Sequence, residues 1–377
     1  MISFLRLQNF KCFEDQSFQL KPLTLLAGLN GTGKSSVIQS FLLLRQSNQQ
    51  GVLQTKGLAL NGDLIHIGRA QDALFQGAGE DVIEFDLNLD NGKQGKWRFN
   101  YYNKASDILD LVSPLHDSEI YQSSLFNNND HYFYYLQAER IGPRRFFETS
   151  DFLVRQNRQL GPGGEYTAHF LSIFDRNTIP NSIMGHPKAV SLALKDQVEA
   201  WLGEVSPGTR ISLTPDIVTD TISLQYSFVM GDQPISSSYR ATNVGFGITY
   251  ALPILVAVLS SVPGSLILIE NPEAHLHPKG QAMMGNLLVR AASCGIQLVV
   301  ETHSDHVLNA IRVAVHDGEL DPDNVQLHFF KRQEQDGQIA VVSPRIDRDG
   351  RLDQWPDGFF DEWDNSLEAL LQPRKER

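Results

Sequence analysis

The alternation of apolar and polar residues predicts a strand-rich N-terminus followed by a helix. Apolar side chains alternate with polar ones over residues 2–10, with one slip, and residues 13–20 and 23–27 have the pattern of two further strands, so three strands are expected there. After a glycine-containing loop, apolar residues recur at helical spacing from Val37 to the polar stretch at 46–50. This pattern predicts a strand, a loop and a helix as one unit.

The last third of the chain is more strongly patterned than the middle. A short apolar strand over 265–269 ends at Glu270. A second strand at 297–300 leads to Ser304, which can cap the next helix. Repeated alternation of strand and helix predicts parallel strands with helices on both faces. Further helices are expected after Gly245, from Pro278 and over 186–205, with short strands at 82–89, 96–102, 132–136, 210–213 and 221–229.

Composition and charge exclude several classes of protein. The chain has 377 residues, 41% of them hydrophobic, and a net charge of -12, so it can bury a large core and has no overall attraction to nucleic acid or anionic lipid. Its two cysteines, Cys12 and Cys294, support neither a disulfide framework nor a thiolate zinc site. No apolar run reaches the roughly 20 residues that span a bilayer, and the N-terminus lacks the apolar segment of a signal peptide. A cytoplasmic protein with no membrane attachment is expected.

The strongest candidate for chemistry is a GxxxxGK[ST] motif between the predicted strand 23–27 and the following helix. Glycines let consecutive backbone amides turn toward phosphate oxygens, Lys34 can reach the β- and γ-phosphates, and the Ser35 hydroxyl can ligate magnesium. The motif therefore predicts a nucleoside triphosphate site. The residues expected to hold the phosphates are Gly28, Asn30, Gly31, Thr32, Gly33, Lys34, Ser35 and Ser36.

Two polar residues lie at the ends of other predicted strands. Glu270 ends the strand 265–269, and a parallel sheet would bring it beside the phosphate loop, where it could hold Mg²⁺ directly or through water. His303 follows the strand 297–300, where it could donate to a γ-phosphate. Both positions are expected at the same edge of the sheet as the phosphate loop.

Two histidines between these strands allow a metal site to be considered. His275 and His277 lie two residues apart, just before the helix predicted from Pro278. A helical HExxH pair would instead place its histidines four apart on one face. We weigh a metal site against hydrogen-bonded turn structure, and favour the turn.

Several segments resemble the ABC-type ATPase core shared by RecF, SMC-like proteins and the overcoming-lysogenization-defect (OLD) group. They are LRLQNFKCFED, the phosphate loop, residues 243–247, LILIENPEAHLHP and VVETHSDH. Within that group, ENPEAHLHPKGQ, THSDHVLNAIR and GFFDEWD resemble a family of bacterial AAA-type ATPases with a C-terminal domain of unknown function. The resemblance implies an α/β fold: an ABC-type P-loop ATPase head with a mixed sheet, an N-terminal antiparallel sheet and a helical insertion. A nuclease domain, as in OLD nucleases, is not expected in this chain.

The resemblance also implies roles for single residues. Glu270 takes the place of the Walker B acid, and His303 that of the switch histidine. Gln137, which follows the predicted strand 132–136, takes the place of the Q-loop glutamine that senses Mg²⁺. The implied cofactors are ATP and Mg²⁺. The residues in the place of the ABC signature include Asn243, Gly245 and Gly247.

One position departs from the ABC pattern. An aspartate and a glutamate usually precede the proline, and the glutamate polarises the attacking water, but here those positions are Glu270 and Asn271. An amide cannot accept a proton at neutral pH. Two interpretations stay open: Glu273 supplies the base, or hydrolysis is slow and nucleotide binding itself is the switch. We favour slow turnover.

The resemblance implies a partner and a cellular role. In this class, ATP lies between the phosphate loop of one subunit and the signature of another, which implies a head-to-tail homodimer with two composite ATP sites. It suggests the ATPase sensor or regulator of a bacterial anti-phage defence system that controls a separately encoded effector. One alternative is a DNA-repair or chromosome-associated ATPase that binds DNA directly. Another is a nucleotide-gated scaffold with little hydrolysis.

A cluster of arginines is the candidate for direct contact with nucleic acid. Arginine pairs with phosphate bidentately, but interleaved Glu139, Glu148 and Asp151 also allow intramolecular ion pairs. The two interpretations stay open. The cluster consists of Arg140, Arg144, Arg145, Arg155 and Arg158.

The motifs predict a discontinuous domain organisation. The ATPase core is expected at 1–50 and 241–320, an insertion of antiparallel strands and helices at 51–240, and C-terminal strands with a tail packed on the core at 321–377. The aromatic and acidic segment 355–363 is either a clasp on the core or an element that docks a partner.

Overall fold

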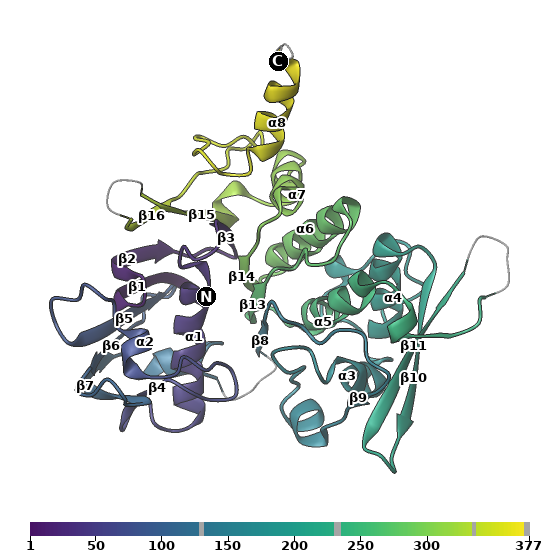
Figure 1. Cartoon of the computed structure of the whole chain (residues 1–377). Helices are drawn as coiled ribbons and strands as arrows, with labels where there is room; N and C mark the ends of the chain where they lie inside the picture. Colours follow the sequence, from purple (N-terminus) through teal and green to yellow (C-terminus); the bar gives the residue numbers. More distant parts are fainter. Residues whose placement is uncertain (128–131, 230–234, 334–336, 373–377) are drawn as a thin grey trace, which may run out of the picture.

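The computed structural model describes residues 1–127, 132–229, 235–333 and 337–372, without the side chains of 113–116 and 362–365. Within these ranges, two six-stranded sheets and one four-stranded sheet form the frame of the molecule (Figure 1). The predicted α/β fold with a mixed sheet and an N-terminal antiparallel sheet is confirmed. None of the helices in the described ranges is long and apolar enough to cross a membrane.

The mixed sheet forms the centre of the fold and has the strand order β16-β15-β3-β14-β13-β8. All neighbours in it are parallel except β15 and β16, which are antiparallel. Because the strands are parallel, the carboxyl ends of β3, β14 and β13 lie at one edge of the sheet. The strands are β3 (Leu23–Gly28), β8 (Phe133–Leu136), β13 (Leu266–Glu270), β14 (Gln297–Glu301), β15 (Val325–Arg332) and β16 (Ile339–Val342).

Helices cover both faces of the mixed sheet, as the apolar runs of its strands predict. Along β13, Leu266 and Leu268 belong to the hydrophobic cluster that contains α1. Ile267 and Ile269 point the other way, into the cluster that contains the other helices. The sheet is therefore the middle one of three layers. The helices are α1 (Lys34–Gln49) on one face and α5 (Phe246–Ser260), α6 (Pro278–Ser293) and α7 (Asp305–His316) on the other.

The N-terminal antiparallel sheet packs its apolar face against α1. Residues Ile83, Phe85 and Leu87 alternate along one strand and are fully buried in the same cluster as α1, which is the period of two that a half-buried strand requires. The order is β2-β1-β5-β6-β7-β4, and the short helix α2 (Ala70–Ala73) lies between β4 and β5 in the chain. The strands are β1 (Ile2–Phe10), β2 (Phe13–Gln19), β4 (Gly57–Ala59), β5 (Val82–Leu89), β6 (Gln94–Asn100) and β7 (Ile108–His116).

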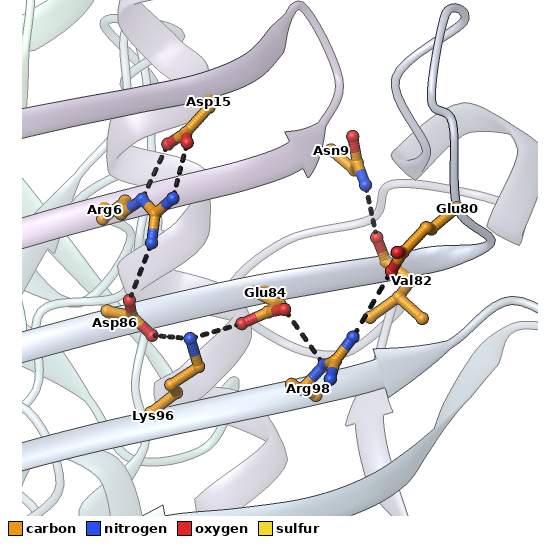
Figure 2. A network of polar contacts seen from close by, with 9 residues as sticks. All are labelled: Arg6, Asn9, Asp15, Glu80, Val82, Glu84, Asp86, Lys96 and Arg98. Atoms are coloured by element: carbon orange, nitrogen blue, oxygen red, sulfur yellow. Dashed lines mark hydrogen bonds and ion pairs between the residues drawn. The ribbon is translucent and has the colours of Figure 1, made fainter.

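The other face of this sheet carries a network of ion pairs, here called the ionic ladder (Figure 2). Lys96 bridges Glu84 at 2.6 Å and Asp86 at 3.6 Å, and opposite charges alternate across neighbouring strands. Such cross-strand pairs stabilise a sheet modestly when solvent reaches them. The ladder consists of Arg6, Asp15, Glu80, Glu84, Asp86, Lys96 and Arg98.

A lateral unit beside α5 contains the four-stranded sheet and two helices. The helix predicted over 186–205 begins only at Leu194, because residues 186–193 form turns and a bridge that pairs Thr178 with Ala193. Its buried face, with Trp201 and Leu202, packs into the large cluster beside α5. The elements are α3 (Thr167–Phe174), α4 (Leu194–Val205), β9 (Phe147–Glu148), β10 (Thr209–Asp216), β11 (Thr221–Phe228) and β12 (Tyr239–Arg240).

The C-terminal segment packs partly on the mixed sheet. Phe359 is buried and meets Phe329 of β15 edge to face, with ring centroids 5.0 Å apart. The following helix α8 (Glu362–Leu371) projects from the body (Figure 1), and Leu370 and Leu371 are exposed on it. The segment around Phe359 therefore acts as a clasp. Trp363 lies outside the described side chains.

The sheets do not follow the division predicted at residues 50, 240 and 320. Strands β1 and β2 pair into the antiparallel sheet with β5 from the middle of the chain. Strand β8, also from the middle, pairs with β13 in the mixed sheet. Strand β15 pairs with β3. The chain thus crosses repeatedly between the sheets, and the carboxyl edge of the mixed sheet collects residues from distant segments.

Candidate functional site

The GxxxxGK[ST] motif forms the loop between β3 and α1. Gly28 has a φ of 140° and Gly33 a φ of 96°, and residues other than glycine rarely adopt these backbone angles. A Cβ at Gly28 would lie 2.2 Å from the carbonyl oxygen of Phe330, and one at Gly33 would lie 2.4 Å from the Sγ of Cys12. Only glycine fits these two positions. The loop is therefore shaped as the motif predicts.

A cavity of about 310 Å³ opens at this loop and at the N-terminus of α1. Helix N-termini present free amides and a positive dipole end, which favour anions such as phosphate. The cavity adjoins a larger one of about 850 Å³, and both are lined by Lys11 and Cys12. The lining of the smaller cavity consists of Lys11, Cys12, Asn30, Gly31, Thr32, Gly33, Lys34, Ser35, Ser36, Gln39 and Glu301.

The side chain of Lys34 is 3% exposed and lies on the loop itself. Its Nζ donates to the carbonyl oxygens of Gly28 at 3.1 Å and Leu29 at 2.8 Å. Burial lowers its pKa, and the nearby Glu301 carboxylate, 3.8 Å from Nζ, opposes that shift. A buried ammonium held mainly by carbonyl oxygens favours an anionic ligand.

Glu301 ends β14 and reaches the phosphate loop. Its Oε2 accepts a hydrogen bond of 2.8 Å from the Ser35 hydroxyl. Burial raises its pKa, the Ser35 hydrogen bond lowers it, and the charges of Glu270 and Glu273 raise it further. Glu301 was not among the predicted site residues, although it ends a buried strand just as Glu270 does. The same rule, applied to 297–301, would have found it.

Glu270 ends β13, as predicted, but its carboxylate turns toward β8. Oε1 accepts from the Tyr135 hydroxyl at 3.1 Å and Oε2 from the backbone amide of Ala138 at 3.0 Å. Burial raises its pKa. Among the described residues, Ser35 bonds to Glu301 and not to Glu270. The structure thus brings Glu270 to the predicted edge, and Glu301 lies between it and the phosphate loop.

The turn after β13 carries Asn271 and Glu273. Asn271 adopts a left-handed φ of 47°, which asparagine tolerates better than most residues, and its Oδ1 is buried without a hydrogen-bond partner among the described residues. Glu273 accepts from the Thr302 hydroxyl at 2.8 Å and from the backbone amide of His303 at 2.7 Å. Both carboxylate oxygens are therefore engaged in holding the turn to the end of β14.

His303 stands at the same edge with an exposed side chain. Desolvation and the charge of Lys34 lower its pKa, while Glu273 opposes them. A neutral imidazole at pH 7 can donate one hydrogen bond and accept another. The structure thus groups Lys34, Glu273, Glu301 and His303 around the loop.

Arg140 is buried at this edge, which excludes it from any surface patch. It is 2% exposed, and burial lowers its pKa to about 10. Its guanidinium donates to the backbone oxygens of Glu270 and Asn271, both at 2.6 Å, and to those of Gln137 and Tyr250. The inclusion of Arg140 in a nucleic-acid cluster was therefore wrong. A buried cation cannot be read from its sequence neighbours.

Two of the other arginines of that cluster make contacts within the chain. Arg155 pairs with Asp151 at 2.9 Å, and the guanidinium of Arg158 lies 3.8 Å from the ring centre of Phe174. Arg144 and Arg145 are exposed. Intramolecular contacts thus account for part of the cluster.

Gln137 lies away from the phosphate loop. Its Nε2 donates to the carbonyl oxygen of Glu139 at 3.0 Å. It lines a separate cavity of about 400 Å³ together with Arg144 and Tyr250. The structure does not bring Gln137 and Ser35 into one site within this chain.

The predicted signature segment forms the start of α5. Gly245 precedes the first helical residue, Phe246, and a Cβ at Gly245 would meet no atom within 4 Å. Asn243, Gly245 and Gly247 line a cavity of about 530 Å³ that shares no lining residue with the phosphate-loop cavity. Within one chain the two predicted halves of the site are therefore separate.

His275 and His277 line the same cavity as the predicted signature segment, and both make contacts within the chain. The His275 ring packs on Tyr250 with centroids 4.5 Å apart, and the Nδ1 of His277 accepts from the amide of Lys279 at the start of α6. Among the described residues, no group of three potential ligands could hold a metal ion.

A family described as "AAA domain, putative AbiEii toxin, Type IV TA system" matches residues 23–309. The chain belongs to this family. Residues 320–370 match a second family, described as "Protein of unknown function (DUF3696)". No curated protein matches the chain. The AAA domain thus spans the phosphate loop, the signature segment and both strand-ending acids.

Two solved structures show which fold this AAA domain adopts. The first is the SmcHead bound to the C-winged helix domain of ScpA: it is 15% identical, has a TM-score of 0.53, and the match covers 92% of this chain and 98% of that chain. The second is an Smc head domain with an extended coiled coil, bound to the C-terminal domain of ScpA derived from Pyrococcus furiosus. It is 12% identical, has a TM-score of 0.52, and the match covers 98% and 99%. The predicted ABC-type, SMC-like head fold is confirmed.

Proposed function

We propose that this AAA-domain chain binds ATP with Mg²⁺ at the phosphate loop and hydrolyses it slowly. The observation that carries the proposal is the buried ammonium of Lys34, which faces an anion-favouring helix terminus in a cavity of about 310 Å³. The adjoining cavity of about 850 Å³ offers room for the nucleoside. The AAA-domain family and the SMC-type fold support the same conclusion.

The contacts at the carboxyl edge of the mixed sheet suggest a role for each residue in ATP binding. The loop amides and Lys34 would bind the phosphates, and His303 would donate to the γ-phosphate. The Ser35 hydroxyl and the Glu301 carboxylate that accepts its hydrogen bond are hard oxygen groups of the kind that suit Mg²⁺. When bound, that ion neutralises phosphate charge. Arg140 would keep the strand ends in place through its backbone contacts.

Slow hydrolysis is supported by the state of the two candidate base residues. Asn271 cannot accept a proton, and both oxygens of Glu273 already accept hydrogen bonds. The same observation favours a second candidate function, a nucleotide-gated scaffold with little hydrolysis. ATPase assays separate the two: Glu273→Gln should lower a measurable rate, and Asn271→Glu should raise it. A rate at background in both the parent and Asn271→Glu would favour the scaffold.

A head-to-tail homodimer would complete the site. The signature segment at the start of α5 lies in a separate cavity, so it would contact the nucleotide held by a second copy. Leu29 in the phosphate loop and Phe246 at the start of α5 are 65% and 55% exposed, and apolar side chains exposed at functional surfaces often mark an interface. Sedimentation with and without Mg²⁺ and ATP should give a dimer only with nucleotide. Gly245→Asp should abolish that dimer but keep ATP binding.

The proposed cellular role is that of a regulator in a bacterial defence system with a separate effector. Its support is the family description, which names a toxin and a Type IV toxin–antitoxin system. Copurification from the native operon with and without ATP would test the effector. The DNA-repair alternative depends on Arg144 and Arg145, and salt-dependent DNA binding lost on Arg144→Glu with Arg145→Glu would favour it.

A further inference from the structure

We propose that Glu301, rather than Glu270, is the carboxylate that shares Ser35 with bound Mg²⁺, and that its charge makes nucleotide binding depend on Mg²⁺. The inference rests on the proposed ATP binding. Glu301 is thereby a positioning residue for the Ser35 hydroxyl and a selector for the cation-bound form of the nucleotide.

The strand order places Glu301 closer to the phosphate loop than Glu270. Strand β14 lies between β3 and β13, so Glu301 pairs with Leu26 on one side and with Glu270 on the other. Its Oε2 is 2.8 Å from the Ser35 hydroxyl oxygen, and its Oε1 is 3.8 Å from the Nζ of Lys34. The carboxylate of Glu270 instead faces Tyr135 and Ala138.

The Ser35 hydroxyl is oriented by this contact. Because it donates its proton to Glu301, its oxygen lone pairs stay free for a cation on the cavity side. A carboxylate that orients a ligand in this way controls metal affinity even when it does not contact the ion. Glu301 and Ser35 both line the cavity at the loop, which is the space that phosphates would fill.

The charge balance explains the dependence on a cation. Glu301 is 6% exposed, and Glu270 and Glu273 add like charge to its surroundings. The Nζ of Lys34 lies 3.8 Å from Glu301 and lowers its pKa, but the same Nζ also donates to two loop carbonyls. Lys11 and Lys34 also line the cavity, but a polyphosphate without a divalent cation would bring its charge against the Glu301 carboxylate. With a cation bound, the Glu301 carboxylate becomes attractive.

The test compares ATP binding in MgCl₂ and in EDTA for the full chain and two matched variants. For the parent, the dissociation constant in EDTA should exceed that in MgCl₂ by at least about 10-fold. Glu301→Gln should reduce this ratio about 10-fold or more, mainly through tighter binding in EDTA. Glu270→Gln, which removes one charge from the same edge, should leave the ratio within about threefold. Direct binding of Mn²⁺ in the presence of ADP, followed by electron paramagnetic resonance, should weaken in Glu301→Gln only.

Other outcomes overturn the inference. A parent that binds ATP equally well in MgCl₂ and EDTA would contradict it and leave the proposed function standing. An unchanged ratio in Glu301→Gln with a collapsed ratio in Glu270→Gln would assign the role to Glu270. A parent that binds no ATP in either buffer would overturn both proposals. Circular dichroism melts check that each variant is folded, and Glu301→Asp, which keeps the charge, should keep the dependence on Mg²⁺.

Discussion

The ionic ladder on the antiparallel sheet (Figure 2) and the edge of the mixed sheet both concentrate charge, but they compensate it differently. In the ladder, bases alternate with acids: Arg6 lowers the pKa of Asp15, and Glu84 raises that of Lys96. Asp86 is the exception, because burial raises its pKa. At the edge, burial raises the pKa of both Glu270 and Glu301. The bases at the edge, Arg140 and Lys34, offset this effect only in part, and incompletely compensated charge of this kind is typical of ligand sites.

The largest expected effect concerns Arg140 at the edge. Arg140→Met removes the donors of four backbone carbonyls, so the free energy of unfolding should fall by about 3 kcal/mol. The matched change Arg98→Met in the ladder should cost less than about 1 kcal/mol, because solvent screens its pairs. Urea unfolding followed by circular dichroism measures both. Equal losses in the free energy of unfolding would contradict the proposed difference between the edge and the ladder.

A second pair of substitutions, one in each region, should change the free energy of unfolding in opposite directions. Glu301→Gln keeps an acceptor for Ser35 but removes a buried charge, so the free energy of unfolding should rise by about 1 kcal/mol in the absence of nucleotide and Mg²⁺. Glu84→Gln removes a carboxylate that pairs with Lys96 and Arg98, and should lower it by about 1 kcal/mol. The same urea titrations apply. Destabilisation by Glu301→Gln would show that its charge is compensated after all.

The smallest expected effect is a difference between the two regions in how their contribution to stability depends on pH. The pKa values of Glu270 and Glu301 are raised above 4.5 in the folded chain, so the folded chain holds these protons at higher pH than the unfolded chain. Their contribution to stability is full below 4.5 and is lost as the pH rises through the folded-state values. Asp15 behaves oppositely, because its lowered pKa gives stability above 3.8 that is lost as the pH falls.

Unfolding titrations between about pH 5 and 8 test this difference without Mg²⁺. Glu270→Gln combined with Glu301→Gln should flatten the decline in stability toward high pH. Asp15→Asn should leave that range unchanged and reduce the loss at lower pH. An unaltered slope in the double variant would mean that the edge carries no uncompensated charge.

Local sequence patterns predicted which residues lie at the carboxyl edge of the mixed sheet where a residue directly follows a predicted strand. The loop 28–36, Glu270 and His303 were found because parallel strands bring their carboxyl ends together. The sequence did not reveal that β14 lies between β3 and β13, and this order decides that Ser35 meets Glu301. Strand order depends on the packing of distant segments, which no local pattern encodes.

Two other differences between the predictions from the sequence and the structure have the same origin. Arg140 looked like a surface residue because acids and arginines surround it in the chain, but in the fold backbone carbonyls from β13, α5 and the end of β8 surround it. The helix over 186–205 was predicted too long, because its apolar periodicity continued through turns that Pro187 and the bridge at Ala193 impose. In both cases tertiary contacts overrode a local signal.

Calorimetric titration of the full chain with ATP in MgCl₂ is the most direct test of the central claim, that the edge of the mixed sheet is a nucleotide site. One ATP per chain should bind, and binding should be lost in Lys34→Ala, because this change removes the buried ammonium of the loop from the cavity. Ladder variant Lys96→Met should bind as the parent does. Undiminished ATP binding in Lys34→Ala, or none in the folded parent, would contradict the account.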